Sequence, residues 1–212
     1  MNLLSYTIKF ANWLYVFGIV FIVSYLIGSI PTGYLFVKLK TGQDLRTIGS
    51  GSTGATNVKR VLGTKYFFTV LLIDALKGAL PVILAANFVN FKAELGIAAV
   101  VAAVAVIVGH SKSLFLSFKG GKSVASGIGT ILALNWQVGL ILAAIWAIIT
   151  YLSKYVSLGS IIALACAPIL MYCFHQPIAY VVYCLAGAIY IIYLHRENIK
   201  RLIKGEENKV RK

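Results

Sequence analysis

Acidic residues are scarce in this sequence. Six Asp and Glu stand against 20 Lys and Arg among 212 residues, and charged residues of both signs make up only 12% of the chain. A soluble domain is about a quarter charged and roughly half apolar, whereas this chain is 59% hydrophobic with a mean hydropathy of +0.86. A single core in a chain of this size cannot bury so much apolar surface. We therefore expect an integral membrane protein and exclude soluble enzymes and nucleic-acid-binding modules, despite the net charge of +14.

Several chemical signatures are also missing. The three cysteines, Cys166, Cys173 and Cys184, lie in apolar runs without C-x-x-C spacing or clustered histidines, so neither a disulfide framework nor a zinc site is indicated. The sequence has no G-x-S-x-G elbow and no H-E-x-x-H motif. A Walker A loop ending at Lys122-Ser123 would need glycine where Leu116 stands. We expect no metal and no cofactor.

Apolar segments dominate what is present. A spanning helix needs about 20 mostly apolar residues. The stretch 123–152 would extend about 45 Å as one helix, too long for a hydrocarbon core of about 30 Å, so we place a hairpin at Asn135-Trp136. The prediction is an all-α, polytopic membrane protein of one domain, 1–212, with about seven transmembrane helices. The expected spans are about 13–37, 66–88, 94–108, 123–134, 137–152, 158–174 and 177–194.

The basic residues orient these spans. Cytoplasmic loops of membrane proteins carry an excess of Lys and Arg. With the N-terminus outside and seven crossings, 17 of the 20 cations fall in the inner segments 38–65, 109–122, 153–157 and 195–212. In the last of these, Ile199, Leu202 and Ile203 alternate with basic residues, which indicates a short amphipathic helix attracted to anionic membrane lipids. The C-terminus is therefore predicted to be cytoplasmic.

One inner segment, Gly49 to Asn57, has the composition of a phosphate-binding loop. Closely spaced glycines let backbone N–H groups converge on an anion, and hydroxyls, an amide and cations follow. A flexible glycine- and serine-rich linker is the alternative. The residues predicted to bind phosphate here are Ser50, Gly51, Gly54, Thr56, Asn57 and Arg60.

A second inner segment contains Gly109-His110 and then Lys119-Gly120-Gly121-Lys122. Two lysines around a glycine pair offer two ammonium groups and close backbone approach to a phosphate. A basic anchor of the positive-inside kind would explain the lysines but not the glycines. We predict that His110, Lys119, Gly120, Gly121 and Lys122 contribute to phosphate binding.

Two charged residues lie within an expected span. Asp74 and Lys77 are three residues apart on one helical face, and ionisable groups inside a membrane are costly unless they pair or face a cavity. A structural pair and a substrate contact both remain open for them.

Four stretches together resemble one known family. The stretches are 49–63, 109–126, 155–160 and 195–207, and Asp74-x-x-Lys77-Gly78 lies between the first two. Their order and spacing are similar to those of the bacterial PlsY family, the acyl-phosphate:glycerol-3-phosphate acyltransferases. The resemblance covers nearly the whole chain. It departs from the family pattern at Ser52, Ser123 and Leu194, and the last departure puts a role for residue 194 in substrate binding in doubt.

The resemblance implies a reaction and a place for it. A fatty acyl group would pass from acyl-phosphate to the 1-position of sn-glycerol 3-phosphate, giving lysophosphatidic acid and phosphate for phospholipid synthesis at the bacterial inner membrane. An acyl-phosphate-producing enzyme would be the functional partner. The resemblance assigns His195, Ser157 and Asn198 as catalytic candidates on the acceptor side. Either a substrate phosphate or His195 would take the hydroxyl proton.

Two features bear on this reaction and its competitor. No histidine is followed five positions later by aspartate, the signature of other glycerolipid acyltransferases. A small transporter or flippase for an anionic lipid precursor would also account for seven spans and basic loops. Transporters place their sites between repeats at the bilayer midplane, however, and no repeat is visible here.

Overall fold

The computed structural model describes residues 3–88 and 95–210, and within them the chain is helical without strands. The prediction of an all-α membrane fold is confirmed. Of the cations counted above, Lys92, Arg211 and Lys212 lie outside the described residues. The elements are α1 (Leu3–Ser29), α2 (Thr32–Thr41), η1 (Leu45–Thr47), α3 (Ala55–Leu62), α4 (Thr64–Phe88), α5 (Leu95–Ser111), η2 (Leu114–Leu116), α6 (Val124–Leu134), α7 (Trp136–Ser153), α8 (Val156–Cys173), α9 (Ile178–Leu194) and α10 (Arg196–Ile203).

Not every expected span is a full-length helix. By length and composition, five segments of the described chain can cross a membrane, and a sixth counts if α9 and α10 form one span bent by 61°. The difference from the expected seven comes mainly from α6. Its 11 residues rise only about 16 Å, roughly half of a hydrocarbon core.

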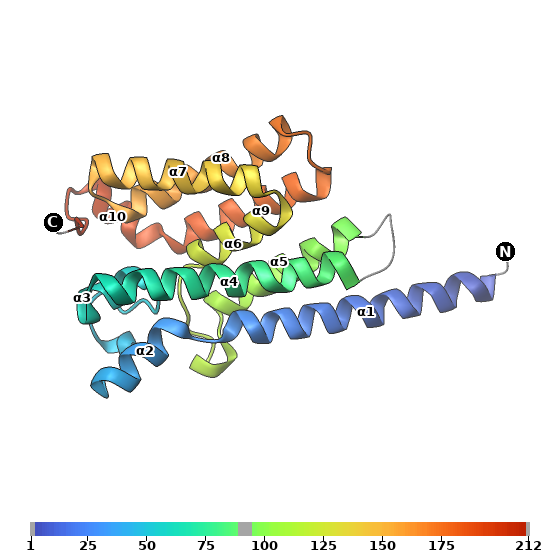
Figure 1. The fold of residues 1–212 in the computed structure, drawn as a ribbon, viewed down its shortest axis with the longest axis horizontal. Helices are drawn as coiled ribbons and strands as arrows, with labels where there is room; N and C mark the ends of the chain where they lie inside the picture. The colour runs from blue at the N-terminus through green and yellow to red at the C-terminus, as the bar shows by residue number, and fades with distance from the viewer. Residues whose placement is uncertain (1–2, 89–94, 211–212) are drawn as a thin grey trace.

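The first expected span, 13–37, lies within one candidate span, Ala11–Thr41, whose helix is interrupted at Ile30 and Pro31. Helix α1 ends at Ser29 and α2 begins at Thr32, because Pro31 has no N–H to continue the helical hydrogen bonds and its ring obstructs the preceding turn. Apolar composition extends across this break, so hydropathy alone does not reveal it. Beyond the break, α2 continues α1 to the end of the bundle at which α3 lies (Figure 1).

Small residues bring the helices close together. Helix α5 lies against α1 and α4 with a buried face rich in alanine, and α4 also packs on α6. A Cβ atom at Gly78 would clash with the Ser126 carbonyl, and one at Gly129 would clash with the Ala75 carbonyl. The backbones of α4 and α6 are therefore in direct contact, the packing that small residues permit between membrane helices.

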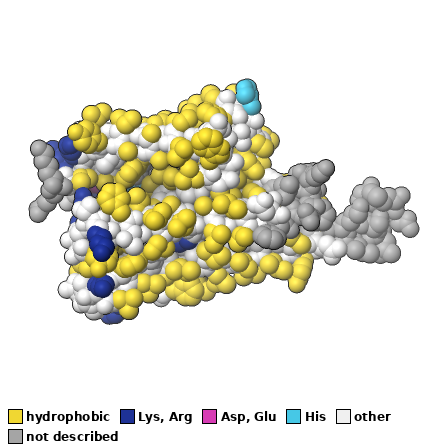
Figure 2. All heavy atoms as spheres, viewed as in Figure 1, with side chains coloured by type: hydrophobic (Ala, Val, Ile, Leu, Met, Phe, Trp, Pro, Cys, Tyr) yellow, Lys and Arg dark blue, Asp and Glu magenta, His cyan; other side chains and the backbone are white. Residues whose placement is uncertain are grey.

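The second half of the chain folds beside the first. Asn135 separates α6 from α7, where the sequence places the hairpin, and its side chain accepts a hydrogen bond from Val138 N at 2.9 Å. Helix α8 packs against both α7 and α9. The end of the bundle opposite the N-terminus contains α3, α10 and the C-terminus (Figure 1). On the face seen in Figure 2, the basic side chains gather mostly at that end, and apolar side chains cover much of the rest.

Candidate active site

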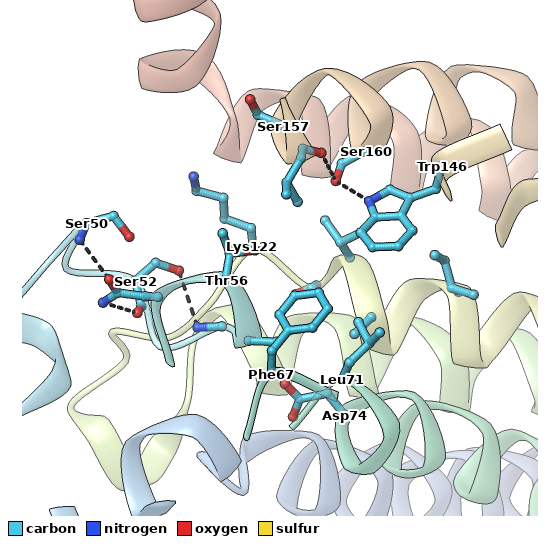
Figure 3. A pocket seen from close by; sticks show the side chains of 18 of the residues that line it. Ser50, Ser52, Thr56, Phe67, Leu71, Asp74, Lys122, Trp146, Ser157 and Ser160 are labelled. Atoms are coloured by element: carbon cyan, nitrogen blue, oxygen red, sulfur yellow. Dashed lines mark hydrogen bonds between the residues drawn. The ribbon is translucent and has the colours of Figure 1, made fainter. Parts of the chain in front are cut away.

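A cavity of about 560 Å³ lies at the basic end of the bundle, between α3, α4 and α6 on one side and α7, α8 and α10 on the other (Figure 3). One part of its wall is polar and the other apolar. The polar part includes Ser50, Ser52, Gly54, Thr56, Asn57, Arg60, Asp74, His110, Lys122, Ser157, His195, Asn198, Arg201 and Glu207. The apolar part includes Phe67, Phe68, Leu71, Leu72, Ala75, Val124, Ala125, Ile128, Ala143, Trp146 and Ala147.

The loop before α3 is shaped by Asn57. This side chain is 1% exposed, and its Nδ2 donates to the carbonyls of Leu45, Ile48 and Ser52 at 3.2, 3.0 and 2.9 Å. Its Oδ1 accepts from Ser50 N at 2.9 Å. The Asn57 amide therefore makes four hydrogen bonds within the loop and holds the shape of the loop at the cavity wall.

Other residues of this loop and of α3 face the cavity. Ser50, Ser52 and Thr56 line it with their hydroxyl groups, and Arg60 adds a cation one turn after Thr56. Within the described part of the chain, the Arg60 guanidinium has no hydrogen-bond or ion-pair partner. Gly51, which we predicted as a phosphate ligand, is exposed and does not line the cavity.

The two lysines of the second motif have different surroundings. Lys122 lines the cavity and its Nζ donates to Asn198 Oδ1, whereas Lys119 is exposed and lies outside the cavity wall. The pKa of Lys122 is lowered to about 8, chiefly because the side chain is buried and also because Arg201 and Arg60 lie near it, while Glu207 opposes the shift. Lys122 is thus the cation that this loop presents to the cavity.

Gly120 and Gly121 pack against His110 and do not line the cavity. Gly121 N donates to the His110 carbonyl at 3.1 Å, and neither Gly120 nor Gly121 has room for a Cβ beside His110. The His110 ring lies 3.0 Å from Ser126 Oγ through Nδ1 and is 8% exposed. The structure therefore gives these residues close contacts with one another, and only His110 among them reaches the main cavity.

A carboxylate from the C-terminal segment completes the polar wall. Glu207 accepts hydrogen bonds from Ser157 Oγ at 3.0 Å, Asn198 Nδ2 at 2.7 Å and Arg201 Nε at 2.7 Å. Burial opposes ionisation of Glu207, but these donors outweigh it and lower the pKa of the carboxyl. The carboxylate thus fixes two of the predicted acceptor-side residues, Ser157 and Asn198, beside Lys122.

His195 lies where α9 ends and α10 begins. It is 4% exposed, lines the cavity, and its Nδ1 is 2.8 Å from the Ile191 carbonyl. Because a carbonyl can only accept, Nδ1 carries the hydrogen in the neutral ring. Nε2 is then the nitrogen that can take a proton.

The apolar limb of the cavity runs between α4 and α7. Phe67 and Leu71 lie on one side and the Trp146 indole on the other, where its Nε1 donates to Ser160 Oγ at 3.2 Å (Figure 3). Phe68 and Leu72 line the limb and are also largely exposed on the outer surface of the bundle, at 60% and 61%. The limb therefore borders the surface that lipid would cover.

Sequence reasoning missed part of this wall. Arg201 belongs to the basic side of the predicted amphipathic helix, and neither its pattern nor those of Glu207 and Trp146 predict a place in the cavity wall. The scarcity of acidic residues does point to Glu207, because a carboxylate among many basic residues is expected to pair with one of them. The described residues hold no group of three or more His, Cys, Asp or Glu side chains that could bind a metal ion.

The fold and the cavity define a class of protein. A helical membrane bundle with a large cavity that joins a cationic, hydroxyl-rich wall to an apolar limb has the features needed to bind a molecule with a phosphate and a hydrocarbon chain. Comparison with known proteins narrows the class. The model of the family described as "Glycerol-3-phosphate acyltransferase" matches residues 18–205, and the chain belongs to this family of enzymes.

Relatives agree along nearly the whole length. The glycerol-3-phosphate acyltransferase of Trichormus variabilis is 44% identical over 211 residues, covering 93% of each chain, and that of Synechococcus sp. (strain JA-3-3Ab) is 46% identical over 188 residues, covering 88% of this chain and 89% of the other. The crystal structure of PlsY (YgiH), an integral membrane glycerol 3-phosphate acyltransferase, matches in its glycerol 3-phosphate form with a TM-score of 0.86 and 37% identity, over 92% of this chain and 96% of that one. Its lysophosphatidic acid form matches with a TM-score of 0.83 and 34% identity, over 92% and 95%. The resemblance to the PlsY family is confirmed.

Proposed function

We propose that this enzyme transfers a fatty acyl group from acyl-phosphate to the 1-hydroxyl of sn-glycerol 3-phosphate, releasing lysophosphatidic acid and inorganic phosphate. The observation that carries the proposal is the continuity of the polar wall with the apolar limb in one cavity. Both substrates carry a phosphate and the donor also carries an acyl chain. Solved relatives in glycerol 3-phosphate and lysophosphatidic acid forms support the acceptor and the product.

The chemistry needs little besides orientation and charge stabilisation. The acceptor's 1-oxygen attacks the acyl carbonyl carbon, the bond from that carbon to the phosphate oxygen breaks, and phosphate leaves with the bonding electrons. Lys122 and Arg60 stabilise the phosphates and the developing charge, and Ser157 and Asn198 orient the acceptor. The Asn57 amide holds the loop that presents Ser50 and Ser52.

The hydroxyl proton has two possible acceptors. The departing phosphate can take it without any protein base, which is consistent with a cavity in which Glu207 is committed to Ser157, Asn198 and Arg201. His195 can take it through Nε2. A His195→Gln enzyme that keeps kcat within a few-fold of wild type assigns the proton to phosphate, and a loss on the order of 100-fold or more assigns it to His195.

We propose that the enzyme works in the bacterial inner membrane with the basic end of the bundle in the cytoplasm. The positive-inside distribution of the sequence supports this orientation. An acyl-phosphate is reactive and amphiphilic, so a second enzyme at the same membrane face must supply it. The amphipathic α10 would rest on the anionic lipid of that leaflet.

Purified protein given acyl-phosphate and glycerol 3-phosphate tests the proposal. We expect stoichiometric release of inorganic phosphate and lysophosphatidic acid. Acyl-CoA in place of acyl-phosphate should give no turnover, because the chain lacks the His-x-x-x-x-Asp pair that activates a hydroxyl toward a thioester. Robust turnover with acyl-CoA would overturn the donor assignment. Movement of substrate across vesicles without acyl transfer would favour the transporter alternative, against which the family membership already stands.

A further inference from the structure

The break between α1 and α2 leaves backbone carbonyls to be satisfied inside the bundle. The Ile30 carbonyl accepts from Lys77 Nζ at 2.7 Å, and the Ser29 carbonyl accepts from Ser113 Oγ at 2.6 Å. An ammonium at the carboxyl end of a helix is favourably placed against the helix dipole. Lys77 therefore caps α1 from α4, and it does so at the Pro31 break, where the path of α2 is decided.

Asp74 balances this buried charge. Its Oδ1 lies 2.7 Å from Lys77 Nζ, and the two side chains are only 2% and 7% exposed. The same oxygen lies 3.9 Å from His110 Nδ1 on α5. A buried pair of this kind is weak evidence for stability, since apolar residues of similar volume often serve a fold as well or better. Its position between two helices calls for another explanation.

Each partner leads to one of the phosphate-binding loops. Beyond Lys77 and the Pro31 break, α2 packs Gly33 so closely on Thr53 that a Cβ there would clash with the Thr53 carbonyl. Thr53 belongs to the first loop. Beyond Asp74, the carbonyl of His110 accepts from Gly121 N, and the ring of His110 fills the space beside Gly121.

We infer that Asp74 and Lys77 are positioning residues that hold the two phosphate-binding loops in register with each other. Lys77 fixes the backbone at Ile30, just before α2 begins, and α2 in turn positions the loop Ser50 to Gly54. Asp74 faces His110, which carries the loop ending at Lys122. One ion pair on α4 thus links loops that come from different parts of the sequence. The inference rests on the proposed function, because it assigns substrate phosphate to both loops.

Paired apolar replacement separates positioning from stability. The variant Asp74→Leu with Lys77→Met removes both charges and leaves no unpaired ion in the bundle, so it is expected to fold. Its KM for glycerol 3-phosphate should rise on the order of 10- to 100-fold, the scale of a displacement near 1 Å. Glu197→Leu with Lys200→Met is the matched control. That pair has the same i, i+3 spacing at 3.1 Å but is exposed on α10, and its loss should leave KM unchanged.

A second variant guards against misfolding of the first. Gly33→Ala keeps the ion pair and disturbs the contacts of α2 with Thr53 and with the Val58 side chain of α3, and it should also raise KM for glycerol 3-phosphate. Amide hydrogen exchange of wild type and both variants supplies a readout that needs no turnover. Exchange should accelerate at 49–53 in both variants and at 120–123 in the paired variant, with α8 unchanged.

The outcomes are distinct. Wild-type KM and exchange in a folded paired variant would overturn the inference and leave the pair purely structural. Wild-type KM in Gly33→Ala would overturn the link from α2 to the first loop. Absence of acyl transfer in the wild-type protein would instead count against the proposed function, while the exchange comparison would still report on the ion pair.

Discussion

Lys119 and Lys122 flank the same glycine pair, yet only Lys122 reaches the cavity. Lys122 donates to Asn198 Oδ1 among Arg60, Arg201 and Glu207, whereas Lys119 is exposed. The two residues have the same charge and nearly the same place in the sequence. At the residue scale, the site therefore depends on which side chain the loop turns inward.

This difference can be measured with two alanine variants. Lys122→Ala removes a charge-assisted phosphate contact worth roughly 1.5–3 kcal/mol, a loss of about 10- to 150-fold in kcat/KM. Lys119→Ala should stay within about twofold, since an exposed cation outside the cavity contributes little. Steady-state kinetics of the two folded variants checks this. Equal losses in both would show that Lys119 also reaches substrate.

The pH dependence of activity should follow the Lys122 ammonium. Its pKa is lowered to about 8 from an ordinary 10.5, so the charge is present below about pH 8 and is lost as the pH rises above it. Because the proposed phosphate contact needs the charged form, kcat/KM for glycerol 3-phosphate should fall as pH rises through about 8. Lys122→Arg keeps its charge throughout this range and should remove that fall. A profile that is the same in both enzymes would assign the alkaline limb to another group.

At the element scale, close contact between α4 and α6 sets the width of the cavity. Gly78 and Gly129 let the two backbones touch, and both helices contribute side chains to the apolar limb. The apolar limb is therefore bounded by backbone contact on one side and opens between α4 and α7 on the other. Any side chain between α4 and α6 would spread the limb.

Gly129→Ala should accordingly be damaging. Its Cβ would meet the Ala75 carbonyl, and overpacking of a tight interface costs typically 1–3 kcal/mol. We expect a lower melting temperature and reduced activity. Gly187→Ala on α9 is the control, because a Cβ there meets nothing within 4 Å and alanine is the better helix former. Equal thermal stability of the two variants would contradict the packing argument.

For the whole molecule, the important feature is that distant segments meet at one end. The same cavity is lined by the loop before α3, the loop before α6, the start of α8, and α10 with the C-terminal segment that follows it. Val210 N, near the end of the chain, also donates to the Lys154 carbonyl at 2.8 Å. Such a meeting requires that α6 and α7 together return the chain to the side from which it came.

Cysteine accessibility tests this arrangement in membranes. In a background without Cys166, Cys173 and Cys184, single cysteines at Ser50, Lys119, Lys154 and Lys209 should react with an impermeant reagent from the cytoplasmic side. A cysteine at His175, in the turn between α8 and α9 at the opposite end, should react from outside. Labelling of positions 119 and 154 from opposite sides would be incompatible with the shared cavity.

The sequence by itself determined the class, the helices and the family. Apolar composition with basic loops is sufficient for a membrane bundle because every backbone group in lipid must be satisfied within a helix. The ordered motifs, 49–63 to 195–207, were sufficient for the acyltransferase family. Much of the candidate site also followed: Arg60 and Lys122 from cations and glycines on one side of a membrane, and Ser157, His195 and Asn198 from the family resemblance.

Only the tertiary structure decided how those residues divide their work. The Asn57 amide hydrogen-bonds to the backbone of its own loop, and Gly120 and Gly121 allow the loop to pack against His110. The role of a buried amide or of a missing Cβ depends on the neighbouring atoms, which the sequence does not give. Glu207 reaches Ser157 across 50 positions of sequence, a contact that no local pattern encodes. The short α6 agrees with the expected span 123–134, but the interruption of the helix at Pro31 came from the structure, because hydropathy reports burial in lipid and not the path of the backbone.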